Sequence, residues 1–375
     1  MLFKSSISTE WSGTFAVISA FLISFAGLLT MSGLTISDPY FLKQGSWIVL
    51  SFIACYMFSK LDYHFLRETK IVILLYFISL LLLTLIFIFG KVSKGAQSWF
   101  SFFGVSFQPS DLVKLVLVIV LAKYLSKRHK DIAYVKHILV TFFYLLIPFL
   151  LVVLQPDLGS ALVLCSIWFG LLLFSGISKR HILLVFGSSL LIFLIAWGFL
   201  FEPYQKARII NFIHPLSDIK GAGYNAHQSI IAVGSGGLFG KGIGYGTQSR
   251  LEFLPEYKTD FIFAAYSEEW GFVGSLGLLL LFFFLFSRLL YFASSAYSNF
   301  EGLFTYGVFI WFITHTIVNI GMNLGVMPVT GIPLPFMSYG GTHILVESIA
   351  LGMCIGMSRY RKNFNRDIER HNFTL

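Results

Sequence analysis

The sequence predicts an all-α, polytopic membrane protein with about ten transmembrane helices. Its 375 residues are 56% hydrophobic and only 12% charged, whereas a soluble domain carries roughly 25% charged residues. Long apolar runs recur along the whole chain, and the mean hydropathy is +0.79. Because a lipid bilayer satisfies no backbone hydrogen bonds, such runs are expected to be helical. We therefore expect a single integral membrane domain over residues 1–375.

Ten stretches are apolar enough to cross a bilayer, although the second and fifth are short against the usual length of roughly 20 residues. They are residues 14–34, 46–60, 71–90, 112–126, 138–154, 159–176, 182–200, 261–287, 303–325 and 341–358. Lysine and arginine gather in the segments that share the side of the N-terminus, and the positive-inside rule makes that side cytoplasmic. The sequence thus predicts an N-in, C-in topology. The net charge of +9 then faces anionic lipid and is no evidence for nucleic acid.

The cysteines and histidines show no motif. Cys55, Cys165 and Cys354 lie in apolar runs, and no two of the nine histidines have the i, i+4 spacing of zinc sites. These residues predict neither a disulfide framework nor a metal site.

One long outer loop, residues 201–260, separates the seventh and eighth spans. Apolar residues recur through RIINFIHPLSD and HQSIIAVGSGGLFG, so we expect it to fold back as short amphipathic pieces. Its glycine-rich part, VGSGGLFGKGIGYGTQS, is not a nucleotide-binding P-loop, because Ser235 occupies the first glycine position and Gly242 follows Lys241. The glycines either permit tight turns and close approach or line a substrate site.

The next stretch, LEFLPEYKTDFIFAAYSEEWGFVG, joins acidic residues to an apolar run. Thr259 is a plausible N-cap of the eighth span, which would hold Asp260 at the level of the outer headgroups. In a straight helix, Glu268 and Glu269 would lie about 12–14 Å deeper. Acids at such a depth are usually functional or paired. The two glutamates are equally compatible with the hydrated end of a shorter span.

Two further clusters carry charge near the same membrane depth. QPSDLVKL places Asp111 and Lys114 at i, i+3 on one helical face, and QPDLGS places Asp157 in a short outer turn. Alone, each is an ordinary cap or ion pair. Together they place acid–base–acid groups at the same outer depth as Asp260, and this coincidence merits a functional hypothesis. The last outer loop, GVMPVTGIPLPFMSYGGTHIL, has three prolines and is expected to be a kinked segment that shapes a lipid groove or simply caps two spans.

These motifs resemble the SEDS family (shape, elongation, division and sporulation) of bacterial peptidoglycan glycosyltransferases. The resemblance runs through GAQSW, QPSDLVKL, LQPDLGSAL, QSIIAVGSGGLFGKGIGYGTQ, LEFLPEYKTDFIFA, SEEWGFVG and NIGMNLGVMPVTGIPLPFMSYGG. GTQSRLEFLPE and GIPLPFMSYGG are more similar to the elongation branch than to the division branch. Three positions depart from the family pattern: Ser98 stands where related chains often have arginine, His343 where a small residue is common, and His214 where Asp or Asn is usual.

The resemblance implies polymerisation of lipid II, with inversion at the anomeric carbon and release of undecaprenyl pyrophosphate. It makes Asp260 the catalytic residue, suited to act as a base for the acceptor hydroxyl. The substrate-binding residues are then Lys114, Asp111, Asp157, Glu256, Lys241 and Arg208, with Arg250 as a further cation for the phosphates. A divalent cation, Mg²⁺ or Mn²⁺, held by carboxylates is an alternative to these cations, and no organic cofactor is expected.

The implied location is the bacterial cytoplasmic membrane, with the active site on the extracytoplasmic face. The implied partners are a class B penicillin-binding protein, other membrane proteins of the elongation complex, and membrane lipid. Two alternatives remain open. A lipid II flippase would also need charged groups in a membrane cavity, and a non-catalytic scaffold would tolerate loss of the Asp260 charge.

Overall fold

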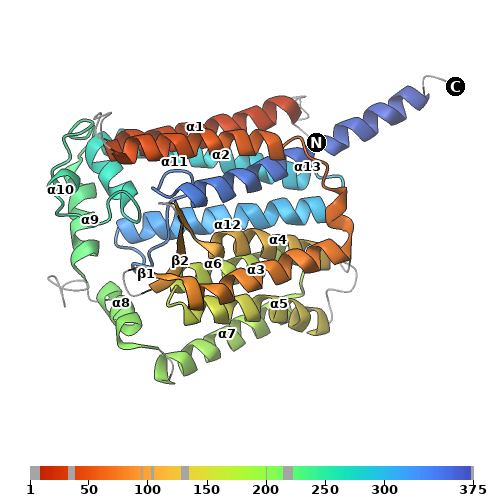
Figure 1. Cartoon of the computed structure of the whole chain (residues 1–375), viewed down its shortest axis with the longest axis horizontal. Coiled ribbons are helices and arrows are strands. Elements are labelled where there is room, and N and C mark those ends of the chain that lie inside the picture. Colours follow the sequence, from red (N-terminus) through yellow and green to blue (C-terminus); the bar gives the residue numbers. More distant parts are fainter. Residues whose placement is uncertain are drawn as a thin grey trace.

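In a computed structural model, the chain forms a bundle of long helices that run side by side (Figure 1). The structure describes residues 9–32, 39–93, 96–102, 105–127, 135–199, 201–213 and 223–372. The long helices are α1 (Thr9–Ser32), α2 (Pro39–Phe58), α3 (Thr69–Phe89), α4 (Pro109–Ser126), α5 (Val135–Leu154), α6 (Leu158–Phe174), α7 (Lys179–Phe199), α11 (Ile262–Ser294), α12 (Asn299–Asn323) and α13 (Gly341–Asn372).

Each predicted span coincides with one of these helices, so the all-α membrane class is confirmed. Among the described residues, eight helices are long and apolar enough to cross a membrane. The two others at predicted positions are α6, which is shorter, and α4, which carries Asp111, Lys114 and Lys123. The count of ten crossings and the N-in, C-in orientation stay predictions.

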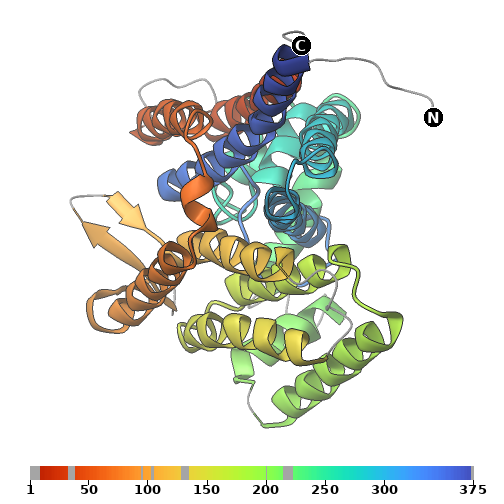
Figure 2. The ribbon, with the colours of Figure 1, turned by 90° about the vertical axis from the view of Figure 1, so that its right-hand side faces the viewer.

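The loop predicted at 201–260 contains three short helices, α8 (Pro203–Ile213), α9 (Tyr224–Ser235) and α10 (Thr247–Arg250). They gather at one end of the bundle, whereas α1 begins and α13 ends at the other (Figure 1). This arrangement agrees with two termini on one side and a folded loop on the opposite side. The sequence analysis did not predict the small antiparallel sheet of β1 (Lys91–Ser93), β2 (Ala96–Phe102) and β3 (Val105–Phe107). Its hairpin projects from the bundle beside α3 (Figure 2).

Helix α12 runs through the interior of the bundle and packs against α4, α6, α11 and α13. Phe304, Trp311 and Phe312 are completely buried along it. In contrast, α7 lies at the edge (Figure 2) and exposes Leu183, Leu184 and many other apolar side chains. Exposed apolar surface of this kind is expected on a helix that faces lipid.

Helix α11 corrects two expectations. Gly271, with φ 66° and ψ −165°, breaks the expected straight span just after Glu268 and Glu269, whose depth in the membrane stays a prediction. They belong to a short first segment, residues 262–270, and both are buried in protein. Thr259 is not the N-cap: Phe261 holds that position, without a side-chain hydrogen bond. The preceding turns delay the helix, because Phe261 donates its N–H to the carbonyl oxygen of Glu256.

Candidate active site at the α8–α10 end

The loop between α12 and α13, residues 324–340, organises this end of the bundle. Its three prolines prevent a regular helix, and its backbone groups find partners in the protein instead. The Leu334 N–H donates to Ser338 Oγ at 2.8 Å, and Ser338 Oγ donates to the Thr259 carbonyl oxygen at 2.7 Å. Leu334 and Phe336 are completely buried. The prediction of a kinked segment packed inside protein is confirmed.

The backbone at Asp260 is held by two asparagines of α12. Asn319 Nδ2 donates to the Asp260 carbonyl oxygen at 2.9 Å and Asn323 Nδ2 donates to it at 3.2 Å. Asn319 also donates to the Ile332 carbonyl oxygen at 2.8 Å, which ties the same point to the loop. Asp260 itself is partly buried, and a Cβ added at Gly331 would lie 3.5 Å from its Oδ2. The Asp260 carboxylate therefore lies beside the loop on a fixed backbone.

The sequence analysis did not single out these asparagines. A signal was available, because two amides one turn apart in an apolar helix are costly unless they are bonded. Asn323 also accepts the Ala264 N–H at 3.0 Å and a hydrogen bond from Ser229 Oγ on its carbonyl oxygen at 2.9 Å. The pair thus joins α9, α11 and the loop.

Asp157 lies on another side of the same loop. It is the N-cap of α6, where its Oδ1 accepts the Ser160 N–H at 2.9 Å, and its Oδ2 accepts from Gln108 Nε2 at 3.0 Å. A Cβ added at Gly159 would lie 2.8 Å from the Thr330 carbonyl oxygen. Asp157 therefore connects the beginnings of α4 and α6, which both border the loop.

Asp111 and Lys114 form the predicted ion pair, with Lys114 Nζ 2.8 Å from Asp111 Oδ1. Both side chains are almost completely buried, at 1% and 3% exposure. On the other side of Asp111, His343 Nδ1 is 3.2 Å from its Oδ2, and His343 Nε2 is 2.9 Å from Glu347 Oε1. The pair is thus part of a larger buried network of charged groups that the sequence analysis missed.

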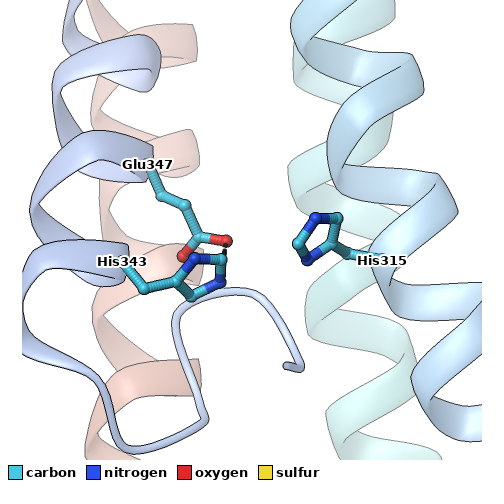
Figure 3. A group of neighbouring side chains, drawn as sticks. All are labelled: His315, His343 and Glu347. Carbon is cyan, nitrogen blue, oxygen red and sulfur yellow. Dashed lines mark ion pairs between the residues drawn. The ribbon is translucent and has the colours of Figure 1, made fainter. Parts of the chain in front are cut away.

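This network reaches α12 and the loop. His343 and Glu347 of α13 face His315 of α12 (Figure 3). His315 Nδ1 is 3.1 Å from the Pro333 carbonyl oxygen, and its Nε2 accepts a hydrogen bond from Trp311 Nε1 at 3.1 Å. Glu347 Oε2 accepts the Phe336 N–H at 2.8 Å. Among the described residues, His315, His343 and Glu347 are also the group with the spacing to hold a metal ion.

Glu268 anchors the glycine-rich segment to α11. Its Oε1 is 2.8 Å from Lys241 Nζ and accepts the Gln248 N–H at 3.0 Å. Glu269 accepts the Gly244 N–H at 3.0 Å, and Arg250 Nη2 is 3.8 Å from its Oε1. The buried acids are therefore paired. Lys241 and Arg250, which the resemblance offered to phosphate, each face a glutamate.

The glycines of this segment allow close approach between main chains. A Cβ at Gly240 would overlap the Glu269 carbonyl oxygen, and one at Gly236 would overlap that of Ser267. The segment in turn bonds the broken helix, because Lys241 N–H donates to the Glu268 carbonyl oxygen and Phe272 N–H donates to that of Gly237. These contacts support the close-approach interpretation.

Three other residues named from the sequence have separate surroundings. Glu256 has a positive φ of 58° and its carboxylate accepts from Thr259 Oγ1 at 3.0 Å. Arg208 is exposed on α8. Ser98 is buried and donates to the Gln155 carbonyl oxygen at 3.3 Å. His214 lies outside the described residues.

Lys258 is a cation that the sequence analysis did not assign. Its Nζ lies 3.9 Å from the centroid of the Tyr40 ring, and Tyr40 in turn meets Tyr339 edge to face. Burial, together with the neighbouring Tyr40, raises the pKa of Tyr339 above its ordinary value, so its phenol is neutral. The Tyr339 N–H also donates to the Lys258 carbonyl oxygen at 2.8 Å. Lys258 is therefore positioned by two aromatic residues, two positions before Asp260.

A family model described as cell cycle protein, covering FtsW, RodA and SpoVE, matches residues 7–363. The chain belongs to this family. It is 39% identical over 296 residues to the peptidoglycan glycosyltransferase MrdB of Escherichia coli K12, covering 78% of this chain and 79% of that relative. It is 35% identical over 367 residues to a probable peptidoglycan glycosyltransferase FtsW of Hydrogenovibrio crunogenus, covering 93% and 92%.

Solved structures support the same membership. A chain from a peptidoglycan synthase complex, described as coordinating polymerization and crosslinking, has a TM-score of 0.80 and 31% identity, covering 92% of this chain and 97% of that one. The rod shape determining protein RodA of Thermus thermophilus has a TM-score of 0.67 and 30% identity, covering 92% and 95%. The SEDS resemblance seen in the sequence motifs is confirmed, and it is RodA-like.

Proposed function

We propose that this chain is a peptidoglycan glycosyltransferase that polymerises lipid II during cell-wall elongation. The observation that carries the proposal is its 39% identity to a peptidoglycan glycosyltransferase over 78% of its length. The site adds a chemical reason. A partly buried carboxylate, Asp260, stands on a backbone fixed by Asn319 and Asn323 at the end of the bundle that holds α8–α10.

In the proposed reaction, the 4-hydroxyl of the acceptor sugar attacks the anomeric carbon of an α-linked donor, and the pyrophosphate leaves from the opposite face. The anomeric centre is inverted, and a β-1,4 bond forms in one displacement. Asp260 takes the hydroxyl proton, as a general base within hydrogen-bond reach of the acceptor. The fixed backbone favours this role, because a base acts efficiently only when its orientation is restricted.

The charge on the leaving pyrophosphate needs a cation. Lys114 is poorly suited to direct contact, because it is buried and paired with Asp111. Lys258 is the better candidate, since its ammonium is held near Asp260 in the chain by a cation–π contact with Tyr40. Lys241 and Arg250 are neutralised by Glu268 and Glu269, so we assign them to holding the loop.

A divalent cation at this site also remains a proposal. Mg²⁺ and Mn²⁺ bind proteins through one or two carboxylates and take their other ligands from water and substrate phosphates. Asp260 fits that pattern as a single carboxylate ligand, whereas the histidine-containing group of Figure 3 does not offer an all-oxygen set. A bound ion would supply charge stabilisation to the pyrophosphate.

The partner and the location complete the proposal. A class B penicillin-binding protein is the expected partner, in keeping with the crosslinking function named for the similar synthase complex. Other elongation-complex proteins and membrane lipid are expected neighbours. The distribution of lysine and arginine supports the cytoplasmic membrane, with the α8–α10 end on the extracytoplasmic face.

The test is lipid II polymerisation by the purified chain, alone and with its partner. Asp260→Asn is compared with Glu252→Gln, which neutralises an exposed carboxylate of the same segment. We expect glycan strands from the wild type and Glu252→Gln, and a loss of roughly 10²-fold or more for folded Asp260→Asn. Polymer from Asp260→Asn at the wild-type rate would refute the base assignment. No polymer from the wild type with partner and divalent cation present, but movement of lipid II across vesicles, would favour a flippase.

A further inference from the structure

A compact group of titratable side chains lies beneath the loop between α12 and α13 and has no role in the proposed reaction. His315, His343 and Glu347 are all buried, and one ligand atom from each lies within 4.8 Å of the others. Figure 3 shows that they converge from two facing helices, with His343 and Glu347 on α13 and His315 on α12. Asp111 and Lys114 of α4 border the group through His343.

The charges of this region do not balance without a further cation. Asp111 and Glu347 contribute two negative charges and Lys114 contributes one positive charge, so one negative charge is left when both imidazoles are neutral. All three side chains are at most 3% exposed. Because an unbalanced charge is costly away from water, the group requires either a proton on His343 or a divalent ion that carries an anion such as hydroxide in its open position.

The geometry around His343 is compatible with a metal ion in place of a proton. A buried imidazolium between carboxylates directs its N–H groups at their oxygens. Here His343 Nε2 is 2.9 Å from Glu347 Oε1 and Nδ1 is 3.2 Å from Asp111 Oδ2, yet none of these four atoms makes an aligned hydrogen bond. Two ligands bound about 2.1 Å from one ion at the tetrahedral angle lie about 3.4 Å apart, so His343 Nε2 and Glu347 Oε1 have to separate by a few tenths of an ångström to hold the ion.

The outer contacts match those that orient metal ligands. A ligating histidine usually donates its other N–H to a carbonyl or carboxylate. His315 Nδ1 lies 3.1 Å from the Pro333 carbonyl oxygen. Because a carbonyl oxygen only accepts, Nδ1 carries the proton and Nε2 has the lone pair. The second oxygen of Glu347 accepts the Phe336 N–H at 2.8 Å, whereas His343 Nδ1 lies 3.2 Å from Asp111 Oδ2 without an aligned hydrogen bond. One contact competes with metal binding. Trp311 Nε1 donates to the lone pair of His315 Nε2, so this hydrogen bond has to break before the ion binds.

We propose that His315, His343 and Glu347 bind a transition-metal ion of the zinc class, which joins α12 to α13 beneath the loop. Two imidazoles and a carboxylate suit Zn²⁺ or a similar borderline ion and disfavour Mg²⁺. Glu347 also accepts a hydrogen bond from the loop backbone, so the ion stabilises the loop that lies beside the Asp260 carboxylate. This site is separate from any cation at Asp260 and does not depend on the proposed function.

The first test measures metal in the full chain, purified in detergent without chelators or a polyhistidine tag. We expect about one ion per chain in the wild type and less than about a tenth in His315→Gln and Glu347→Gln. After the ion is removed by a chelator, added Co²⁺ should give visible d–d absorption in the wild type. A wild type that retains no ion and gives no Co²⁺ absorption would overturn the proposal, whether or not the variants fold.

Three further variants sharpen the test. His181→Gln removes a histidine that bonds Ser178 at the surface, and it should retain the ion. Trp311→Phe removes the competing donor, so Co²⁺ should bind as tightly or more tightly. Asp111→Asn should weaken Co²⁺ binding roughly 10- to 100-fold, as losses of outer partners do. Full retention of the ion by His315→Gln, or weaker binding by Trp311→Phe, would count against the site.

Discussion

Removal of the Lys114 ammonium should destabilise the protein far more than loss of an ordinary membrane hydrogen bond. Lys114→Met keeps the length of the side chain but leaves the Asp111 carboxylate without its partner at 2.8 Å. Both groups are at most 3% exposed, and breaking a buried ion pair on one side costs about 3–5 kcal/mol. Side-chain hydrogen bonds between membrane helices average only about 0.6 kcal/mol. A buried ion pair and an ordinary interhelical hydrogen bond therefore predict losses of stability that differ several-fold.

The assay is SDS-induced unfolding in mixed micelles, followed by tryptophan fluorescence. Lys114→Met should lower the free energy of unfolding by about 3–5 kcal/mol, whereas the double variant Asp111→Asn, Lys114→Met should recover most of that loss because no unpaired charge remains. Lys123→Met is the matched control, because it removes another lysine of α4 whose Nζ contacts the main-chain oxygens of Leu66 and Arg67. A loss below about 1 kcal/mol for Lys114→Met would refute the assignment of a buried, charged pair.

Three other changes test the site. Asn319→Leu removes one of the two donors to the Asp260 carbonyl oxygen and the Asn319 donor to that of Ile332, so unfolding should become easier by roughly 1–3 kcal/mol and polymerisation should fall; unchanged activity would mean that this contact does not position Asp260. Gly240→Ala introduces a Cβ against the Glu269 carbonyl oxygen at a φ of 79°, so proteolysis of the glycine-rich segment should accelerate, whereas Gly234→Ala, with open space around it, should not. Lys258→Gln should raise the KM for lipid II more than it lowers kcat if the ammonium binds pyrophosphate in the ground state; an unaltered KM would exclude that role.

Local patterns predicted the parts of this protein that depend on local geometry. The apolar runs placed all ten long helices, because the length of a run reports directly on the thickness of hydrocarbon that it crosses. The i, i+3 spacing predicted the ion pair of Asp111 and Lys114, since helical neighbours meet whatever the rest of the fold does. Prolines in the loop before α13 likewise predicted a kinked segment. The role of Asp260 came from family resemblance and remains to be tested.

The sequence alone therefore determined the membrane class, the helices, the local ion pair and the family. Only the tertiary structure decided how distant residues meet. Glu268 pairs with Lys241, 27 positions earlier, and the helix breaks at Gly271, where the sequence had predicted one continuous span. His315 and His343 converge only because α12 and α13 pack together, so no short spacing in the sequence predicted their contact. A local pattern records the geometry of one helix, whereas the partners of a buried charge depend on which helices become neighbours.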